Sequence, residues 1–368
     1  MKIHLQTVRR QNVTTSQTIR TVAGSLLAGF LTISIVFLIK GVNPLYAFGR
    51  IFGGSFGSFY GLKETITKSI PLITIGTGLV LAFKGKFWNI GAEGQLLMGA
   101  TCGTWVALNL GPLLPGALTV PLMFLMGFIG GGLIGAIPAI LKVRFGTNEV
   151  ISTLMLNYVA AELVQLLVVG PWKGETQHGF PYTDDFPQSA VLGLLPGSRI
   201  HAATLVLAIA AAVILFLVIY KTRFGYEIRV IGENPDAARY AGINFFKNLL
   251  IMMFVSGGIA GIAGVGEVGG IHHHLSYPFT ISAGYGYTAI IVAWLARLNP
   301  LLVIVSGFFF AGIKVGGDAI QISLGLPGAT VDVFNGILLL FLIVGEYFLN
   351  NRILVHVIRR GVRAKEGN

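Results

Sequence analysis

Charged side chains are scarce in this sequence. Asp, Glu, Lys and Arg together make up 11% of the 368 residues, whereas hydrophobic residues make up 54%, and the mean hydropathy is +0.77. Soluble domains typically carry about 25% charged residues. The composition therefore excludes an ordinary water-covered surface and indicates that a lipid bilayer is the solvent for most of the chain.

Cysteine and the familiar catalytic motifs are also lacking. The single cysteine, Cys102, excludes a disulfide framework and a cysteine metal cluster. The chain contains no phosphate-binding GxxxxGK[ST] loop, no HExxH and no GxSxG. A GxGxxG pattern at Gly130, Gly132 and Gly135 lies inside an apolar run without a preceding strand, and we interpret it as helix packing. The sequence thus predicts a chain that is not an enzyme and that holds no cofactor or metal of its own.

Three adjacent histidines, His272–His274, are the nearest approach to a metal-binding set. Three consecutive residues cannot all point in one direction, so we expect interfacial hydrogen bonds there. Their role stays open at this point.

Long apolar runs dominate the chain. A helix needs about 20 mostly apolar residues to cross the hydrocarbon core, and ten segments meet or approach this length. They are about 22–40, 66–83, 88–110, 117–140, 150–170, 202–220, 248–270, 284–297, 300–317 and 332–349. The first follows a basic stretch, and because it is longer than the apolar part of a signal peptide we expect a retained helix.

The positive charges can be used to orient these segments. With the N-terminus in the cytoplasm and alternating sides, most Lys and Arg fall in cytoplasmic segments, as the positive-inside rule requires. The net charge of +11 is then a topology signal and does not indicate a nucleic-acid partner. We predict an all-α polytopic membrane protein with about ten transmembrane helices and both termini cytoplasmic. It forms one transmembrane domain, 1–368, with a basic N-terminal segment, 1–21, and a C-terminal tail, 350–368.

Polar residues inside apolar segments are the first candidates for function, because they are costly in a bilayer. Asn89, Glu93 and Gln95 cluster around Gly91 and Gly94 in the third segment. The glycines allow a broken or tightly packed helix, and a broken helix exposes backbone groups that suit a gate or a polar solute path. A purely structural role, in hydrogen bonds between helices, stays an equal alternative.

A second polar stripe opens the fifth segment. At 100° per residue, Glu149, Ser152, Thr153 and Asn157 fall on one side of a helix. This side is expected to face the protein interior or a water-filled cavity, although Glu149 can also serve as a helix cap. Five further acidic residues are left without a role: Glu162, Glu267, Asp318, Asp332 and Glu346.

The segment 220–247 is the most informative polar stretch. Asn234 is a good N-cap, Pro235 fits the first helical turn, and Asp236 suits the positive end of the helix dipole. Gly242 supplies a stop. We predict a short helix of about two turns, capped at both ends and exposed to the cytoplasm, where it is well shaped to dock into a groove of a partner. Arg239 and Asp236 are its candidate contact residues.

Four motifs together resemble the permease family of bacterial ABC importers that handle simple sugars, nucleosides and branched-chain amino acids. They are NIGAEGQ at Asn89–Gln95, TNEVISTLMLNY at Thr147–Tyr158, GENPDAARYAGI at Gly232–Ile243 and GYGYTAIIVAWLA at Gly284–Ala296. The first two look most like the larger of the two paired permeases in nucleoside (guanosine-type) importers.

The resemblance implies a set of partners. These are cytoplasmic ABC ATPase subunits that hold the ATP and Mg, a second and homologous permease, and an extracytoplasmic substrate-binding protein, all at a bacterial plasma (inner) membrane. It also implies that the segment matching Gly232–Ile243 is the coupling helix that meets the ATPase, and that a small polar solute, a nucleoside before a simple sugar, crosses by alternating access. An ion-gradient-driven transporter is the alternative, and an intramembrane enzyme is a more distant one.

Overall fold

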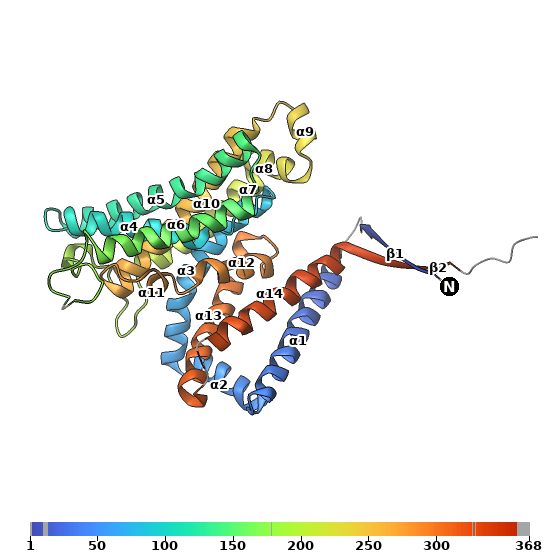
Figure 1. Ribbon diagram of the computed structural model, residues 1–368, viewed down its shortest axis with the longest axis horizontal. Coiled ribbons are helices and arrows are strands. Elements are labelled where there is room, and N and C mark those ends of the chain that lie inside the picture. Colours follow the sequence, from blue (N-terminus) through green and yellow to red (C-terminus); the bar gives the residue numbers. More distant parts are fainter. Residues whose placement is uncertain (1, 10–13, 178, 326, 328, 359–368) are drawn as a thin grey trace, which may run out of the picture. The chain divides into compact units, whose positions relative to one another are not determined.

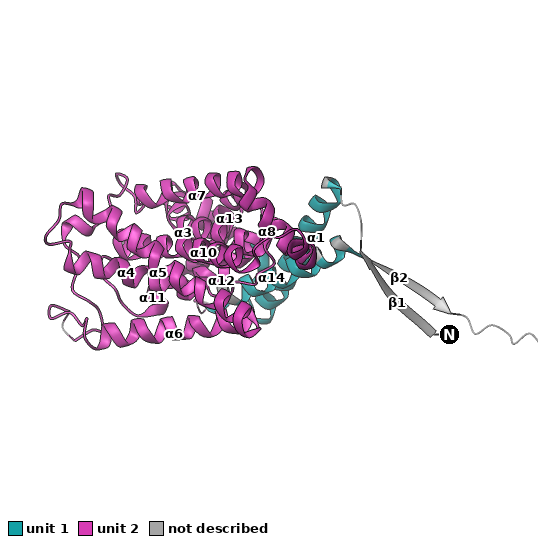
Figure 2. Ribbon diagram, turned by 90° about the horizontal axis from the view of Figure 1, so that it is seen from above, with its two compact units in different colours: residues 1–47, 329–368 teal, residues 48–328 magenta. Residues whose placement is uncertain are grey.

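The computed structural model describes residues 2–9, 14–177, 179–325, 327 and 329–358. The chain divides into two compact units, one made of residues 1–47 with 329–368 and the other of residues 48–328 (Figure 2). The single-domain organisation expected from the sequence stays a prediction.

Helices account for nearly all the regular structure of the described residues (Figure 1). In chain order they are α1 (Thr15–Ile39), α2 (Pro44–Phe56), α3 (Phe59–Lys84), α4 (Ala92–Asn109), α5 (Gly116–Phe145), α6 (Glu149–Val169), η1 (Gln188–Ala190), α7 (Ala202–Lys221), α8 (Arg223–Glu233), α9 (Pro235–Tyr240), α10 (Phe245–Glu267), the π-helical η2 (Val268–His272), α11 (Pro278–Ser282), α12 (Tyr285–Leu295), α13 (Pro300–Leu324) and α14 (Ala329–Asn350).

Each of the ten predicted segments coincides with a helix. Eight stretches within the described residues are long and apolar enough to cross a membrane, and one of them joins α11 and α12. The other two predicted segments correspond to α4, which is rich in glycine and polar residues, and to α14. The all-α polytopic membrane fold is confirmed, while the number of crossings and the side of each terminus stay predictions.

The first unit is a helix pair, α1 and α14. α1 begins at Thr15, several residues before the predicted start, because Thr14 and Gln17 form a reciprocal capping box. Phe30 packs edge-on against Phe334 with ring centroids 5.8 Å apart. Aromatic packing and an apolar interface thus hold the pair together.

The terminal segments, expected as tails, form a two-stranded ladder. β1 (Lys2–Arg9) runs antiparallel to β2 (Asn351–Ile358), in a register that pairs Lys2 with Ile358 and Arg9 with Asn351. The β-branched residues Ile353, Val355 and Val357 recur at every second position, which favours a strand. This pattern was present in the sequence and the prediction of tails missed it.

The second unit has α3 at its centre. Most residues of α3 between Thr65 and Phe83 are buried, and the helix packs against α7, α10, α12 and α13. Gly76 permits a close approach, since a Cβ there would lie 3.1 Å from a methyl of Val303 on α13. α3 is thus surrounded by other helices of this unit along most of its length.

Glycines bring α4, α5 and α10 into backbone contact. A Cβ on Gly261 of α10 would overlap the carbonyl oxygen of Gly127 on α5, and a Cβ on Gly99 of α4 would overlap Gly261. Gly131 and Gly257 meet in the same way. Figure 1 shows the three helices lying together. Small residues are expected at such membrane interfaces because they allow backbones to approach.

Two helices of the second unit, α4 and α12, each begin after a non-helical break in the chain, and we call these two the interrupted helices. α3 ends at Lys84 and α4 begins only at Ala92, so Asn89 lies in a non-helical segment and not in the helix predicted from residue 88. The eighth predicted segment is broken between α11 and α12, where Ala283 and Gly284 take positive φ values of 43° and 69°. Glycine adopts this conformation without strain, and Gly284 is the N-cap of α12.

Candidate functional site

Glu93 joins the two interrupted helices. It lies in the first turn of α4, is only 3% exposed, and accepts hydrogen bonds from the N–H of Gly286 at 2.7 Å and of Gly284 at 3.2 Å. These N–H groups belong to the first turn of α12, where a helix has no internal acceptor for them. Glu93 therefore caps α12 from a different helix, and the positive end of the α12 dipole favours its charge.

Asn89 and Gln95 form a closed amide pair beside Glu93. Each amide nitrogen donates to the other residue's oxygen at 3.0 Å, and the Asn89 oxygen also accepts from the N–H of Gly91 at 3.0 Å. Asn89 further donates to Ser256 of α10 at 3.3 Å. Both amides are buried. The pair fixes the non-helical segment before α4 and ties it to α10.

Two residues of the polar stripe on α6 complete the cluster. Asn157 accepts from the N–H of Gly94 at 2.8 Å and donates to the carbonyl of Ile90 at 2.9 Å, while Thr153 accepts from the N–H of Ile90 at 3.3 Å. Asn157 also donates to the hydroxyl of Tyr287 on α12 at 3.2 Å. Both side chains are buried, so the stripe faces the interior as its periodicity predicts.

The other two residues of that stripe lie outside the cluster. Glu149 forms an ion pair with Lys142 of α5, with an N–O distance of 2.8 Å. The Ser152 hydroxyl donates to the carbonyl of Asn148 at 2.9 Å, one turn back in the chain. Of the seven residues predicted to line a pathway, five come together around the start of α4, namely Asn89, Glu93, Gln95, Thr153 and Asn157.

The polar groups of this cluster are turned toward one another. Non-helical backbone inside a membrane protein needs partners for its N–H and C=O groups, and the side chains of Asn89, Glu93 and Asn157 supply them. The cluster positions the starts of two helices. Its role as pathway lining stays a prediction.

Three aromatic side chains, one of them from the residue before Asn89, pack against one another. Trp88 is 41% exposed and stacks on Trp294 of α12, with centroids 5.5 Å apart and an interplanar angle of 24°. Phe83 contacts both rings. Trp294 was not singled out from the sequence, because one tryptophan in an apolar run carries no local pattern that separates it from packing.

The predicted capped helix is present as α9. The Asn234 side chain accepts from the N–H of Ala237 at 3.0 Å, Pro235 occupies the first turn, and Gly242 ends the segment with a φ of 71°. Asp236 and Arg239 form an exposed pair 3.7 Å apart. The helix is a little over one and a half turns long rather than two, because Ala241 and Gly242 already leave the helical conformation.

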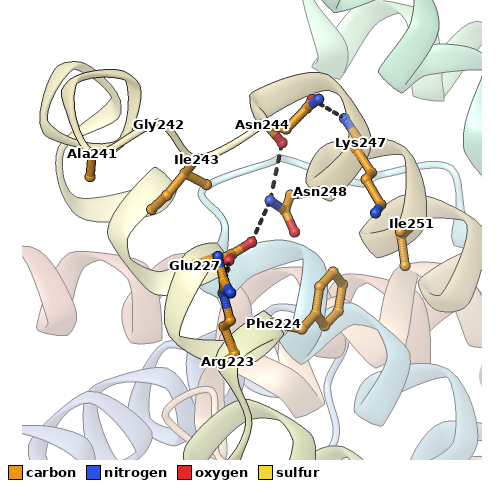
Figure 3. Close-up of a pocket in the computed structure, with 10 residues that line it drawn as sticks. All are labelled: Arg223, Phe224, Glu227, Ala241, Gly242, Ile243, Asn244, Lys247, Asn248 and Ile251. Atoms are coloured by element: carbon orange, nitrogen blue, oxygen red, sulfur yellow. Dashed lines mark hydrogen bonds and ion pairs between the residues drawn. The ribbon is translucent and has the colours of Figure 1, made fainter.

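A pocket of about 530 Å³ lies beside α9, between α8 and the start of α10 (Figure 3). On its floor Glu227 accepts from Asn248 of α10 at 2.8 Å and from Arg223 at 2.8 Å. Both bonds favour the ionised carboxylate and hold the pKa of Glu227 below its usual range, and the bond from Asn248 has the larger effect. Glu227 thus fastens α8, and the α9 helix that follows it, to α10.

The three histidines lie at the end of η2, where His272 is the last helical residue and His273 is the C-cap. His274 is 3.4 Å from Asp185 and stacks on Tyr182, with ring centroids 4.9 Å apart. Burial lowers the pKa of His274, although Asp185 acts in the opposite direction. The described residues contain no group of metal-ligating side chains. The Asp184 carboxylate accepts a hydrogen bond from the Thr176 hydroxyl in its own loop. This bond is the main reason that the pKa of Asp184 is lowered.

Charged residues of α3, α10 and α13 were missed as a group. Lys68 and Asp318 form an ion pair, the Lys314 ammonium donates to the carbonyl of Ala283 at 2.8 Å, and Glu267 is buried. The rule that ionisable groups in membrane spans carry function points to each of them. No role is predicted for them from the sequence, because the separation of Lys68 and Asp318 along the chain gives no sign that the two side chains pair.

Comparisons with known proteins agree with these features. The family model described as "Branched-chain amino acid transport system / permease component" matches residues 61–343. A glucose ABC transporter permease of Haloferax volcanii is 36% identical over 98% of this chain and 96% of its own length. A guanosine ABC transporter permease of Bacillus subtilis is 32% identical over 86% of this chain and 90% of its own length. A nucleoside ABC transporter permease of Lactococcus lactis is 30% identical over 87% of this chain and 89% of its own length.

The match covers the interrupted helices, the Glu93 cluster and the capped helix α9 alike. By this similarity the chain belongs to the permease family of ABC transport systems that includes nucleoside and sugar permeases.

Proposed function

We propose that this chain is the membrane-spanning permease subunit of an ABC importer in a plasma membrane. It carries a small polar solute, for which a nucleoside is the first candidate and a simple sugar the second. ATP is hydrolysed on partner subunits, and the chain itself performs no covalent chemistry. A second, homologous permease and an extracytoplasmic binding protein complete the complex. The guanosine, nucleoside and glucose permeases among the relatives support this range of solutes.

The observation that carries the proposal is the attachment of α9. A short exposed helix with a side-chain cap at its start is held through Glu227 and Asn248 to α10. α10 in turn reaches the Glu93 cluster through the hydrogen bond between Ser256 and Asn89. A displacement of α9 by an ATPase would therefore be transmitted to the interrupted helices. Alternating access follows if that motion opens and closes the cluster.

Co-purification and uptake test the proposal. The chain is purified in mild detergent from cells that express it with its neighbouring transport genes, reconstituted in vesicles, and assayed for uptake of labelled guanosine and glucose. We expect an ATPase and a second permease to co-purify and uptake to require ATP. Uptake that persists without the ATPase but collapses with an ion gradient would establish the secondary-transporter alternative instead.

A further inference from the structure

α6 packs against its own unit with one side only. Thr153 and Asn157 are buried on the side that meets α4 and α5, whereas Met155 and Leu166 on the opposite side are exposed. Figure 2 shows α6 at the edge of the second unit. The helix is long and apolar enough to cross a membrane, so its outward face needs a covering of lipid or of protein.

Glu162 lies at the centre of this outward face and at membrane depth. At 100° per residue it is turned about 180° away from the buried Thr153, and it is exposed. It lies about 10 Å along the helix from Val169, the nearer end of α6. A carboxylate at such a depth faces protein or a water-filled space, because its transfer into lipid is costly. Lipid is therefore a poor covering for the face at Glu162.

α7 shows how a lipid-facing helix of this chain differs. The two helices have similar lengths, 21 residues for α6 and 20 for α7, and 22% and 28% of their apolar stretches are buried. Every exposed residue of α7 before Tyr220 is apolar, Val213 and Leu217 among them. The exposed face of α6 instead carries Glu162 and Gln165. This contrast indicates that α6 is covered by protein where α7 is covered by lipid.

The outward face of α6 is also hollowed. A hollow of about 760 Å³ runs along it, and Glu162 and Gln165 line this hollow together with apolar side chains such as Leu166. Contacts between membrane helices combine close packing with polar side chains that hydrogen-bond from one helix to the other. The face therefore fits a helix of another membrane-spanning chain.

The charge in the hollow selects the kind of chain. Among the described residues that line it, Glu162 is the one carboxylate and none is a lysine or arginine. A second copy that met the hollow through the same surface would bring two such carboxylates to one interface at membrane depth. A chain of different sequence, with a basic or amide side chain at this depth, complements Glu162 instead.

We infer that the outward face of α6 is the surface that binds the second permease, and that this partner places a basic or amide side chain against Glu162. The inference rests on the proposed function and deepens it, because it assigns the surface through which the two permeases meet. On its inner side α6 holds the segment before α4 through Thr153 and Asn157. A movement of the second permease would thus reach the Glu93 cluster through a single helix.

Photocrosslinking in the complete complex, held in lipid nanodiscs, tests this surface. A benzophenone amino acid replaces Leu166 on α6 or, as the matched control, Leu217 on α7. Both leucines are exposed, at 66% and 49%. We expect irradiation to join the position of Leu166 to the second permease, identified by mass spectrometry of the adduct. The position of Leu217 should give adducts with lipid only.

A matched pair of bulky substitutions measures the strength of the contact. Leu166→Trp overfills a packed interface, whereas Leu217→Trp enlarges a side chain that faces lipid. We expect Leu166→Trp to lower the amount of second permease that co-purifies with this chain about tenfold, and Leu217→Trp to leave it unchanged. Glu162→Leu, which removes the acceptor, should lower it too. Recovery of this chain itself should be normal in all three variants, because the three side chains are exposed.

Three results would overturn the inference. If the position of Leu166 links only to lipid, to a second copy or within this chain, the second permease does not cover this face, although its co-purification would leave the proposed function intact. A normal amount of second permease with both Leu166→Trp and Glu162→Leu leads to the same conclusion. If neither an ATPase nor a second permease co-purifies with the wild-type chain, the proposed function fails and this surface fails with it.

Discussion

Glu93 and Gly286, 193 residues apart in the chain, are joined by a hydrogen bond of 2.7 Å that makes the first turn of α4 the cap of α12. A Cβ on Gly286 would overlap the backbone of Glu93, so the two helices approach as closely as their backbones allow. This bond is the clearest point at which the interrupted helices depend on each other.

Replacement of Glu93 is expected to destabilise the fold. Glu93→Ala leaves two buried N–H groups without an acceptor, which costs roughly 3 kcal/mol, whereas Glu93→Gln keeps one acceptor oxygen and costs less. Thermal unfolding in detergent should rank the midpoints as wild type, Gln variant, Ala variant. Glu162→Gln, at an exposed position of α6, should unfold like wild type. Equal midpoints for all four proteins would contradict the capping role.

A methyl group in the glycine interface should be strongly destabilising. In Gly261→Ala the new Cβ would overlap the carbonyl oxygen of Gly127, and overpacking of this kind costs about 3 kcal/mol or more when backbones must move apart. Gly24→Ala is the control, since nothing lies within 4 Å of a Cβ there. Yield and monodispersity after detergent extraction report the result. A Gly261→Ala protein with normal yield and monodispersity would show that the helices can move apart at this interface without loss of the fold.

Loss of the bond between α8 and α10 should uncouple ATP hydrolysis from uptake. Asn248→Ala removes the donor to Glu227, so α9 can move without α10. We expect the reconstituted complex to keep hydrolysing ATP while uptake falls about tenfold. Asn109→Ala is the matched control, because Asn109 also donates to the carbonyl four residues earlier but, within the described part of the chain, makes no hydrogen bond to another helix. If uptake and hydrolysis fall together, the defect lies in assembly.

Exposed residues of α9 should affect coupling without affecting stability. The Asp236 and Arg239 side chains are 91% and 68% exposed, and such surface pairs contribute about 0–1 kcal/mol. Asp236→Ala and Arg239→Ala should therefore unfold normally, yet show reduced uptake per ATP hydrolysed. Glu175→Gln, in the long loop after α6, serves as the exposed control. Normal uptake by both variants would show that neither residue contributes to the contact with the ATPase.

The Glu227 carboxylate gives a prediction for pH. Its pKa is below the usual value, first because Asn248 donates to the ionised form. A carboxyl with a lowered folded-state pKa contributes stability above its unfolded pKa of about 4.3, and this contribution is lost as the pH falls through the folded pKa. The difference in unfolding midpoint between wild type and Glu227→Gln should be constant above about pH 5 and should narrow below about pH 4. Glu233→Gln, at the exposed end of α8, should show no such difference.

The sequence predicted those features whose causes are local. The caps at Asn234 and Gly242 depend on residues within one turn, and α9 formed as expected. The inward face of α6 followed from helical periodicity, and Thr153 and Asn157 are buried on it. Glu149 belonged to the same arc, but a lysine of the neighbouring helix α5 pairs with it, and no pattern within α6 contains that information.

Features that depend on convergence of distant segments could not be predicted. The break between α11 and α12 is stabilised by Glu93 from another helix, so neither segment alone indicates it. Lys68 and Asp318 are 250 residues apart and pair directly. Glu267 has no predicted role because it lies near the end of a predicted segment, whereas the structure places its side chain in the interior.

The backbone contact at Gly99, Gly127 and Gly261 also has an entropic consequence. Glycine has no side-chain rotamers to lose when it is buried, so the ordering cost of this interface falls on the backbone, which is most flexible at glycine in the unfolded chain. Dispersion attraction between directly apposed backbones falls off steeply once a gap opens. The three helices should therefore separate in one cooperative step or not at all, and α4, α5 and α10 should exchange their amide hydrogens as a single unit.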